Sequence, residues 1–467
     1  MKSVDTVIKN GKVYTSRDLF EADIAIRDGK IVGIGQSEYF QKADEVIDAK
    51  GKCIIPGLWY PHCHFRDPGL TNKEDFESGH RCAAAGGVTF TIDQTNTDPY
   101  PSNLENWNVK REEAKKKCIV DYNHYAAALV TEEIPKLAET GTIGFKMFNT
   151  IHPKEVYPYI SDLAVTNHGL MYELYEAVAK TGMTISVHHD DSEWVKWMVT
   201  KEYLNKGKTT ANDFHEAYQR GFMYGHGMVM GLSVSLYIAK LTGVRLYVLH
   251  AGMEKEYDIE LIRHARSLGQ TVYTELEMLP YLVDKKRADK YGPYAVPWGK
   301  DPKIAWDLIK NGWADVALIE HAPHTPAEVE PGWKNMWDIP LGLLGIQEFL
   351  PIMLTNVNRG NISLHDLIRV TSENPAKIFG LYPLKGAIQI GSDADLTIVD
   401  MEKEQKFTKD MVLSKSGWTL FDGETFKGWP IQTLVRGKTV MKNGNITGKP
   451  GQGKFIPRKV VTGEVRK

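Results

Sequence analysis

Short apolar runs alternate with longer amphipathic stretches from about residue 57 to about residue 375. Runs of five or six apolar residues are typical of buried strands, and the stretches between them show the spacing of amphipathic helices. This alternation indicates parallel βα units, and about 320 residues of it favour a (β/α)8 TIM barrel over an open sheet. We expect strands at Val88–Ile92, Gly144–Phe148, Thr184–His188, Arg245–His250 and Asp315–Ile319, and helices at Leu170–Thr181, Val234–Thr242 and Ile259–Leu268.

The two ends of the chain instead show short β-forming runs and tight turns. Asn10-Gly11 and Asp28-Gly29 each lie between β-formers, a pattern that predicts hairpins. A similar pattern follows Asn374, with an apolar strand within residues 387–400 and a hairpin within residues 435–444. The predicted domains are a β-sandwich from residues 1–56 and 376–450, a barrel over residues 57–375, and a polar tail, loosely attached or in contact with another subunit, over residues 451–467.

Polar side chains lie in or just after several of the predicted barrel strands. His62 and His64 follow an apolar run two positions apart, so their imidazoles can point to one side and hold a divalent metal. The carboxyl ends of the strands form the catalytic face of a (β/α)8 barrel, so we expect the polar residues to meet there. For His62 and His64 the alternative is two surface histidines in a loop, and for His188 and His250 it is a hydrogen-bonding cap at a strand end. The other residues of this kind are Lys146, inside a strand, and His188, His250 and Glu320, each at a strand end.

Lys146 stands among Phe145, Met147 and Phe148. Burying its ammonium costs several kcal/mol unless it is paired or neutralised, and burial lowers the pKa of a lysine. A neutral amine can capture carbon dioxide as a carbamate, whose two oxygens can bridge two metal ions. The alternative is a lysine that reaches the rim or pairs with a carboxylate. A set of nitrogen and oxygen ligands suits zinc, with manganese or iron as alternatives.

Composition and charge narrow the class of protein. The chain has 467 residues, of which 42% are hydrophobic and 25% charged, and a net charge of −2. These values are typical of soluble globular proteins and do not favour binding to nucleic acid or anionic membranes. No apolar run approaches the length of a membrane span, and the N-terminus lacks the apolar core of a signal peptide. The four cysteines form no Cys-x-x-Cys pair, so we expect a cytoplasmic protein with reduced thiols.

Several longer motifs accompany the candidate ligands. They are Pro-Gly-x4-His-x-His-x-Arg-x-Pro-Gly at 56–69, Ala-Gly-Gly-Val-Thr at 85–89, Glu-x-x-Pro at 277–280, His-Ala-Pro-His-Thr at 321–325, Asn-Pro-Ala-Lys at 374–377 and Gly-Ser-Asp-Ala-Asp at 391–395.

With these motifs the chain resembles the amidohydrolase superfamily, in the branch of dihydroorotases, allantoinases and hydantoinases. The resemblance runs nearly end to end and implies a barrel with a flanking β-sandwich. It also implies a site for two divalent metal ions. One ion would be held by His62, His64 and residue 320 and the other by His188 and His250, with carboxylated Lys146 between them.

Two residues make the resemblance closest to the dihydroorotases. Arg66 follows the first histidine pair, and Asn96 lies in a turn of the family's Asn-Thr-x-Pro type. In similar dihydroorotases this arginine and asparagine, with the histidine at position 324, bind the substrate carboxylate, and a guanidinium with an amide suits that group. The alternative for Arg66 is a surface ion pair with Asp67.

The implied reaction is hydrolysis of a cyclic amide by metal-bound hydroxide, with Glu320 transferring the proton and a substrate that carries a carboxylate. Position 320 is aspartate in the family, Tyr281 stands where a second histidine is common, and residues 188–191 also depart from the usual pattern, so the natural substrate stays open. The alternatives are allantoinase or hydantoinase (dihydropyrimidinase) activity, a decarboxylase or lyase on the same metals, and a non-catalytic scaffold. Similar proteins are commonly oligomers, which implies a homodimer or homotetramer.

Overall fold

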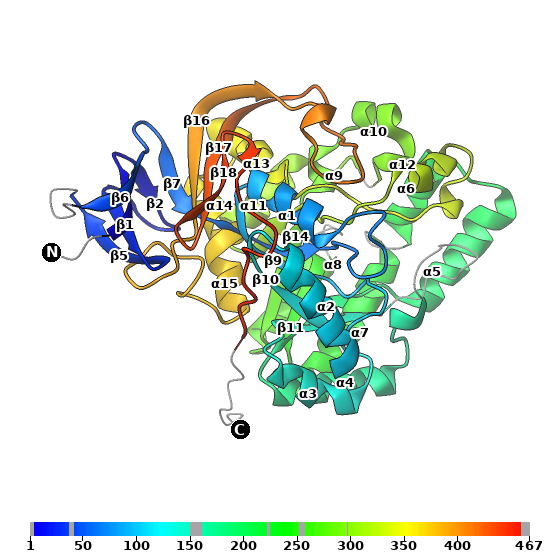
Figure 1. The fold of residues 1–467 in the computed structure, drawn as a ribbon. Coiled ribbons are helices and arrows are strands. Elements are labelled where there is room, and N and C mark those ends of the chain that lie inside the picture. Colours follow the sequence, from blue (N-terminus) through cyan, green and yellow to red (C-terminus); the bar gives the residue numbers. More distant parts are fainter. Residues whose placement is uncertain are drawn as a thin grey trace.

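The computed structural model describes residues 4–36, 42–149, 161–221, 225–251, 257–296 and 298–458. Its centre is an eight-stranded sheet in which β8 to β15 follow one another in chain order and every neighbouring pair is parallel (Figure 1). The strands are β8 (Leu58–Cys63), β9 (Val88–Asp93), β10 (Asp121–Ala127), β11 (Gly144–Phe148), β12 (Thr184–His188), β13 (Arg245–Ala251), β14 (Val272–Glu277) and β15 (Val316–Leu318).

The sheet closes into a barrel where the segment after β15 meets β8. Cys63 and His321 form a parallel bridge. The N–H of His64 donates to the carbonyl of His321 at 2.7 Å, and the N–H of His321 donates to the carbonyl of His62 at 3.2 Å. The predicted (β/α)8 barrel is therefore confirmed. Closure also brings Glu320, the residue before His321, beside the two histidines of β8 and its end.

Helices cover the outside of the barrel (Figure 1). Local capping fixes where several begin: Asp75 accepts the N–H of Ser78 in a capping box, and Asn103 and Asn167 cap the next two long helices. The helices are α1 (Phe76–Ala85), α2 (Leu104–Lys117), α3 (Ile134–Glu139), α4 (His168–Lys180), α5 (Ser192–Met198), α6 (Ala211–Arg220), α7 (His226–Thr242), α8 (Tyr257–Ser267), α9 (Leu279–Leu282), α10 (Lys285–Tyr291), α11 (Pro302–Lys310), α12 (Pro326–Val329), α13 (Phe349–Asn358), α14 (Leu364–Ile368) and α15 (Asn374–Ile378).

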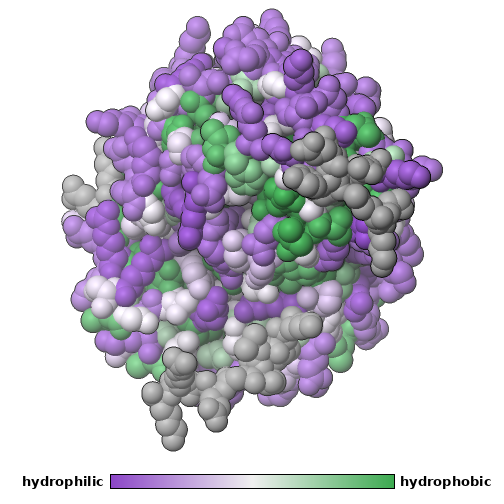
Figure 2. All heavy atoms as spheres, turned by 90° about the vertical axis from the view of Figure 1, so that its left-hand side faces the viewer, coloured by the Kyte–Doolittle hydropathy of each residue, from purple (hydrophilic) through white to green (hydrophobic). Residues whose placement is uncertain are grey.

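Two further sheets form the β-sandwich, which combines strands from both ends of the chain. Between them pack Ile8 and Ile24 from the smaller sheet with Ile54 and Leu396 from the larger one. Seen from the sandwich side, the molecule is mainly hydrophilic, with a smaller hydrophobic area (Figure 2). The four-stranded sheet has the order β5 (Lys30–Gly35), β4 (Asp23–Arg27), β1 (Val4–Lys9), β6 (Ala43–Asp48), and the seven-stranded sheet β19 (Asn445–Ile446), β18 (Lys438–Lys442), β17 (Thr425–Val435), β16 (Leu396–Lys406), β7 (Cys53–Pro56), β2 (Lys12–Tyr14), β3 (Leu19–Glu21).

The hairpin predicted at Asn10-Gly11 is wrong, because β1 and β2 belong to different sheets. Asn10 has a φ of 62°, and its side-chain amide donates to Asp48 at 2.9 Å. A Cβ at Gly11 would lie 2.5 Å from the Ile54 side chain, so glycine is needed where the chain crosses from one sheet to the other. By contrast, the hairpin at Asp28-Gly29 is confirmed, since β4 and β5 pair antiparallel.

The beginning of the C-terminal tail packs firmly against the barrel. The N–H of Lys454 donates to Asp121 at 2.9 Å, and Phe455 forms a parallel bridge with Tyr122. The guanidinium of Arg458 donates to the carbonyls of Gly182 at 3.0 Å and Ile143 at 3.2 Å. The prediction of a loosely attached tail is therefore wrong for residues 451–458, and residues 459–467 lie outside the described part.

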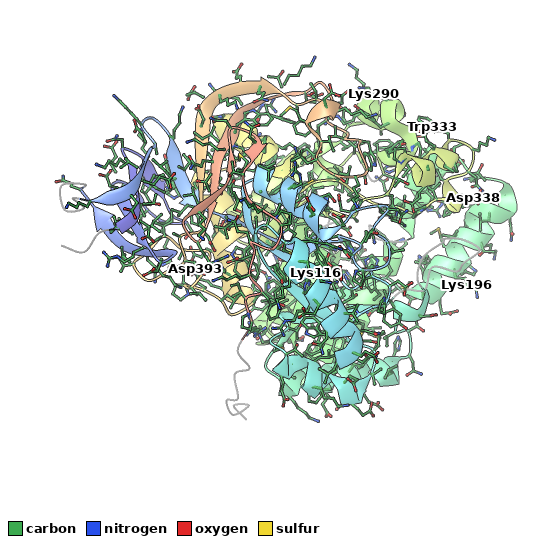
Figure 3. All side chains as sticks on the ribbon, viewed as in Figure 1. Lys116, Lys196, Lys290, Trp333, Asp338 and Asp393 are labelled. Atoms are coloured by element: carbon green, nitrogen blue, oxygen red, sulfur yellow. The ribbon has the colours of Figure 1, made fainter. Side chains whose placement is uncertain are left out.

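The two ends of the barrel can be followed in Figure 3. Asp393 lies at the end that faces the sandwich, whereas Trp333 and Asp338, from the segment after β15, lie toward the opposite end. The carboxyl ends of the barrel strands face this second end. In the part of the chain that the structure describes, every helix is too short or too polar to cross a lipid bilayer.

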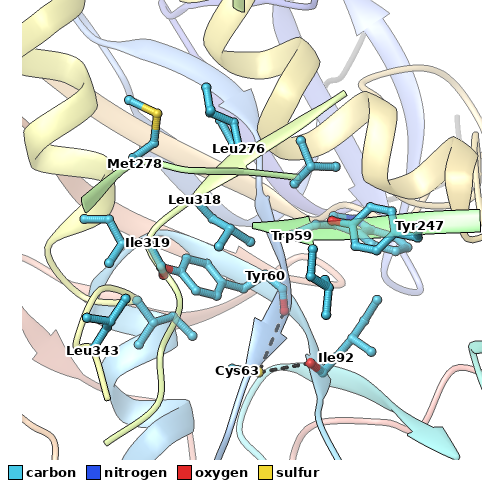
Figure 4. Packing of buried hydrophobic residues seen from close by; sticks show 14 of the residues in the cluster. Trp59, Tyr60, Cys63, Ile92, Tyr247, Leu276, Met278, Leu318, Ile319 and Leu343 are labelled. Atoms are coloured by element: carbon cyan, nitrogen blue, oxygen red, sulfur yellow. Dashed lines mark hydrogen bonds between the residues drawn. The ribbon is translucent and has the colours of Figure 1, made fainter. Parts of the chain in front are cut away.

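Beneath the barrel mouth, apolar side chains hold β8 in place (Figure 4). The hydroxyl of Tyr60 donates to the carbonyl of Ile319. The thiol of Cys63 lies 3.2 Å from the carbonyl oxygen of Ile92, within the same buried cluster. The strand that carries the first histidines is thus fixed on both sides, by β9 and by the segment after β15.

Candidate metal centre

Glu320 lies at the centre of a group of histidines at the carboxyl ends of the barrel strands. Its Oε1 is 2.8 Å from Nε2 of His64 and 3.3 Å from Nε2 of His62. Its Oε2 is 3.8 Å from Nε2 of His250. Ligand atoms of His62, His250 and Glu320 all lie within 4.8 Å of one another, so these three residues can hold a metal ion.

His188 and Lys146 extend this group across the barrel mouth. The ring of His188 lies 5.2 Å from the ring of His250, centroid to centroid, and its Nε2 is 3.3 Å from a carboxylate oxygen of Asp190. Lys146 is buried, with Nζ 4.3 Å from the centroid of the Phe148 ring. The six candidate metal ligands thus come from β8, β11, β12, β13 and the segment after β15, and all lie at the carboxyl ends of these strands or within them.

Burial and neighbouring charges set the protonation of the group. Burial lowers the pKa of the Lys146 amine to about 7 and holds the pKa of His250 well below its usual value. At His62, burial acts in the same direction, but Glu275 and Glu320 outweigh it and raise the pKa to about 9. Burial opposes ionisation of Glu320, yet the neighbouring imidazoles hold its pKa well below the usual range. Glu320 is therefore a carboxylate at neutral pH.

The donor atoms of this group fit a divalent metal ion. The buried Nζ of Lys146 and Nδ1 of His250 make no hydrogen bond within the described residues. Such unsatisfied polar atoms are rare inside proteins unless they serve a function or an ion. Imidazole nitrogens and carboxylate oxygens are the ligands that zinc and similar divalent ions prefer.

Arg66 and His324 form a second part of the site. An Nη of Arg66 lies 3.3 Å from Nε2 of His324. Arg66 is only 1% exposed, so the alternative of a surface ion pair with Asp67 is not what the structure shows; Asp67 pairs with Lys117 at 2.8 Å. Burial lowers the pKa of His324 to about 3, so its imidazole is neutral. Asn96 is buried in the segment after β9, with Oδ1 lacking a hydrogen-bond partner among the described residues.

Three residues at the site were not singled out from the sequence. One carboxylate oxygen of Glu275 lies 2.6 Å from Nδ1 of His62, and the other accepts the hydroxyl hydrogen of Tyr247 at 2.8 Å. The ammonium of Lys73 lies 3.4 Å from Nδ1 of His324. A signal for Glu275 was present in the sequence. Glu275 and Glu277 stand two apart within a β-forming run, the same spacing that identified His62 and His64.

Glu320 has a longer side chain than the aspartate expected at this position, and hydrogen bonds of the surrounding backbone accommodate it. The N–H of Glu320 donates to the carboxylate of Glu277 at 2.7 Å, and the other oxygen of Glu277 accepts the N–H of Leu279 at 2.9 Å. Burial raises the pKa of Glu277 to about 8. With its backbone held in this way, the glutamate still reaches three imidazoles.

Comparison with known proteins identifies the family. The chain is 32% identical to the L-hydantoinase of Paenarthrobacter aurescens over 464 residues, which cover 97% of this chain and 98% of that protein. The chain belongs to the amidohydrolase family. Residues 344–440 match the family model described as amidohydrolase family, and residues 51–201 match the one described as dihydro-orotase-like. A dihydroorotase of Methanosarcina mazei is also 32% identical, over 467 residues covering 97% of this chain and 98% of that protein.

Solved structures agree with this membership of the amidohydrolase family. The L-hydantoinase (dihydropyrimidinase) from Arthrobacter aurescens superimposes with a TM-score of 0.89 at 31% identity, over 97% of this chain and all of that one. A D-hydantoinase structure gives a TM-score of 0.87 at 26% identity, over 98% and 99% of the two chains. Both the family and the barrel with its flanking sandwich, expected from the sequence, are thereby confirmed.

Proposed function

We propose that this amidohydrolase opens the ring of a small cyclic amide that carries a carboxylate, in the manner of a dihydroorotase. The observation that carries the proposal is the convergence of one carboxylate, one buried amine and four imidazoles at the barrel mouth. This complete donor set argues against a non-catalytic scaffold, and family membership favours hydrolysis over decarboxylation or elimination.

We assign two divalent metal ions to the donor group, zinc first, with manganese or iron as alternatives. His62, His64 and Glu320 would hold one ion and His188 and His250 the other, with Lys146 between them as a carbamate. The lowered pKa of Lys146, about 7, supports this role because carbon dioxide reacts with the neutral amine. When bound, such ions lower the pKa of water to about 7 and polarise a carbonyl oxygen.

Glu320 is the proposed acid–base residue. As a carboxylate it can accept a proton from the attacking water and return it to the ring nitrogen that leaves. Its backbone N–H is held by Glu277, so the carboxylate stays directed into the histidine group.

Arg66, His324 and Asn96 are the proposed substrate-binding residues. The buried guanidinium of Arg66 offers two parallel N–H donors to a carboxylate, and Nε2 of His324 lies 3.3 Å from it. Asn96 contributes a buried amide whose oxygen is without a hydrogen-bond partner in the described residues.

A second candidate is hydantoinase or dihydropyrimidinase activity. The observation in its favour is that the L-hydantoinase relative and structure match the chain over almost its whole length. Such a substrate ring carries the imide without a carboxylate, and Arg66 would then bind an imide oxygen with fewer contacts.

A substrate panel tests the proposal and separates the candidates. Purified protein, loaded with zinc and bicarbonate, is assayed with dihydroorotate, hydantoin, dihydrouracil and allantoin, each with and without a chelator. We expect dihydroorotate to be opened with the highest kcat/KM and chelation to abolish turnover. Preference for hydantoin would move the proposal to the second candidate, and no turnover of any ring would contradict cyclic-amide hydrolysis.

The outward face of α7 supports a homodimer or homotetramer. Met230, Tyr237 and Leu241 are 42%, 63% and 55% exposed, and Val234 completes an apolar stripe at spacings of four, three and four residues. The buried face of α7 is also apolar, so apolar side chains lie on two opposite faces of the helix, with Ser233 and Lys240 exposed beside the stripe, and a second apolar face is typical of a helix that is covered on both sides. We propose that a second copy of the chain covers this stripe. Sedimentation equilibrium of Tyr237→Glu tests it, with a smaller assembly than wild type expected.

We also propose that the chain works in the cytoplasm. A separate proposal is that the boundaries between the sandwich and the barrel lie near residues 56 and 375. The four cysteines are buried and free, as suits a reducing compartment. Cell fractionation tests the location, and limited proteolysis followed by mass spectrometry tests the boundaries.

A further inference from the structure

Glu275 lies beneath the metal centre on β14, a strand that supplies none of the assigned ligands. The side chain is fully buried, and both carboxylate oxygens are engaged. Oε1 lies 2.6 Å from Nδ1 of His62, and Oε2 accepts the hydroxyl hydrogen of Tyr247 at 2.8 Å. Tyr247 comes from β13, so neighbouring strands hold the carboxylate against the first histidine of β8.

This contact fixes the tautomer of His62. A carboxylate can only accept, so Nδ1 carries a proton and Nε2 is the nitrogen left to bind a metal ion. Nε2 is the atom that faces Glu320, at 3.3 Å. The ring is therefore held with Nε2 directed to the position proposed for the metal ion.

The charges around Glu275 support a contribution of its carboxylate to metal binding at His62. A buried carboxylate is costly unless a positive charge compensates it. At Asp93 of β9, the strand next to β8, such a partner is present, since Lys110 lies 2.7 Å away. No lysine or arginine forms an ion pair with Glu275 in the described part of the chain; its direct contacts are His62 and Tyr247. His62 is therefore the group that can compensate Glu275, either as an imidazolium or by transmitting the charge of a metal ion that would bind at its Nε2.

We propose that Glu275 is a positioning residue that acts through His62 and raises the affinity of the site for its divalent metal ion, with Tyr247 holding Glu275 in place. This inference rests on the proposed function, since it assumes that His62 is a metal ligand. Hydrogen-bonded carboxylates behind a histidine ligand orient the ring and make it more basic, and their loss typically costs about 10–100-fold in metal affinity.

Metal titration of the full-length protein tests the role of Glu275 without any substrate. Metal-depleted wild type, Glu275→Gln and Tyr247→Phe are titrated with Co²⁺, and both the dissociation constant and the visible absorption spectrum are recorded. Glu348→Gln is the matched control, because Glu348 is also a buried carboxylate but is not a proposed ligand or neighbour of one. Circular dichroism and gel filtration verify that each variant folds.

We expect Glu275→Gln to bind Co²⁺ about 10–100-fold more weakly than wild type, with an altered spectrum. Tyr247→Phe should weaken binding less, in the same direction, and it tests the inference independently if Glu275→Gln does not fold. Glu348→Gln should match wild type. Unchanged affinity and spectrum in both site variants would overturn the inference while leaving the proposed function intact. A wild type that binds no divalent metal would overturn both.

Discussion

Two buried groups of ionisable side chains lie at opposite ends of the barrel strands, and they differ in the source of their positive charge. At the sandwich end, the ammonium of Lys385 lies 2.7 Å from Asp121, 3.0 Å from Asp393 and 2.6 Å from Asp395. Arg436 adds a second contact to Asp121 at 3.0 Å. At the mouth, the carboxylate of Glu320 is surrounded by imidazoles, and the nearby Lys146 amine makes no hydrogen bond within the described residues.

The comparison shows that close spacing of potential ligands does not identify a metal site by itself. The three aspartates lie as close together as the ligands at the mouth, within 4.8 Å. Burial acts against the charge of Lys385, but the three carboxylates outweigh it and raise its pKa, so Lys385 stays a cation and compensates them together with Arg436 and Lys30. The aspartate group is thus a structural joint between barrel and sandwich, whereas we propose that the donors at the mouth serve an ion and a substrate.

The largest expected effect concerns the carboxylate at the mouth. Glu320→Gln keeps the size of the side chain but cannot accept a proton, so we expect kcat to fall by about a thousandfold, within the range of acid–base catalysis. The melting temperature should change little, since an amide can still donate to or accept from the neighbouring groups. Steady-state kinetics and thermal unfolding measure the two quantities. Retention of more than a tenth of the activity would remove Glu320 from the mechanism.

The sandwich-end group should show the opposite behaviour. Lys385→Met removes the cation that the three carboxylates share, although Arg436 still contacts Asp121 and Lys30 still contacts Asp393. Removing one partner of a buried ion pair typically costs about 3–5 kcal/mol. We expect markedly earlier unfolding in urea, with kcat per folded molecule and metal content unchanged. A variant as stable as wild type, or one that loses metal, would show that the two groups are not functionally distinct.

Much of the site was predictable because its signals are local. Lys146 and Glu320 interrupt or end apolar runs, and in a parallel barrel all such positions lie at one end. Glu275 could not be assigned a role in this way, since its meaning depends on contact with His62 and Tyr247 from other strands. Lys385 likewise looks like a surface lysine in sequence and is understood only once Asp121, more than 200 residues earlier, is placed beside it.

The fold shows the same division between local and distant information. The alternation of apolar runs with amphipathic stretches indicated parallel strands and helices, and the barrel followed from the length of that region. At Asn10-Gly11, however, the local turn signal gave the wrong pairing, because packing against Ile54 decides which sheet receives the next strand. The described part of the tail was misjudged for a similar reason: polar sequence says little about the carbonyls that Arg458 reaches.

Arg66 is another buried cation that can be compared with Lys385. It lies beside His324, whose imidazole is neutral. If this charge serves a substrate carboxylate, Arg66→Lys loses the paired N–H donors and should raise KM for dihydroorotate by about 10–100-fold, the cost of about one to two charged hydrogen bonds. KM for hydantoin, which has no carboxylate, should change much less. Equal effects on both substrates in steady-state kinetics would contradict the proposed carboxylate contact.

The smallest expected effect distinguishes the two buried lysines by their chemistry. Lys385 is held as a cation, whereas burial lowers the pKa of Lys146 to about 7, so its amine is mostly neutral at pH 8 and mostly charged at pH 6. Only the neutral amine reacts with carbon dioxide. Metal-depleted protein should therefore recover activity about tenfold more slowly at pH 6 than at pH 8, at equal dissolved carbon dioxide and zinc, because its neutral fraction differs by about that factor.

Recovery is measured on samples transferred to one common assay pH, which separates the reaction of Lys146 from the pH dependence of turnover. Lys146→Arg provides the control, since a guanidinium stays charged at both pH values and should not recover at either. Equal rates at the two pH values, or full recovery without carbon dioxide, would mean that Lys146 stays an amine. The mouth would then resemble the sandwich end more closely than proposed, with a lysine serving as its own buried cation.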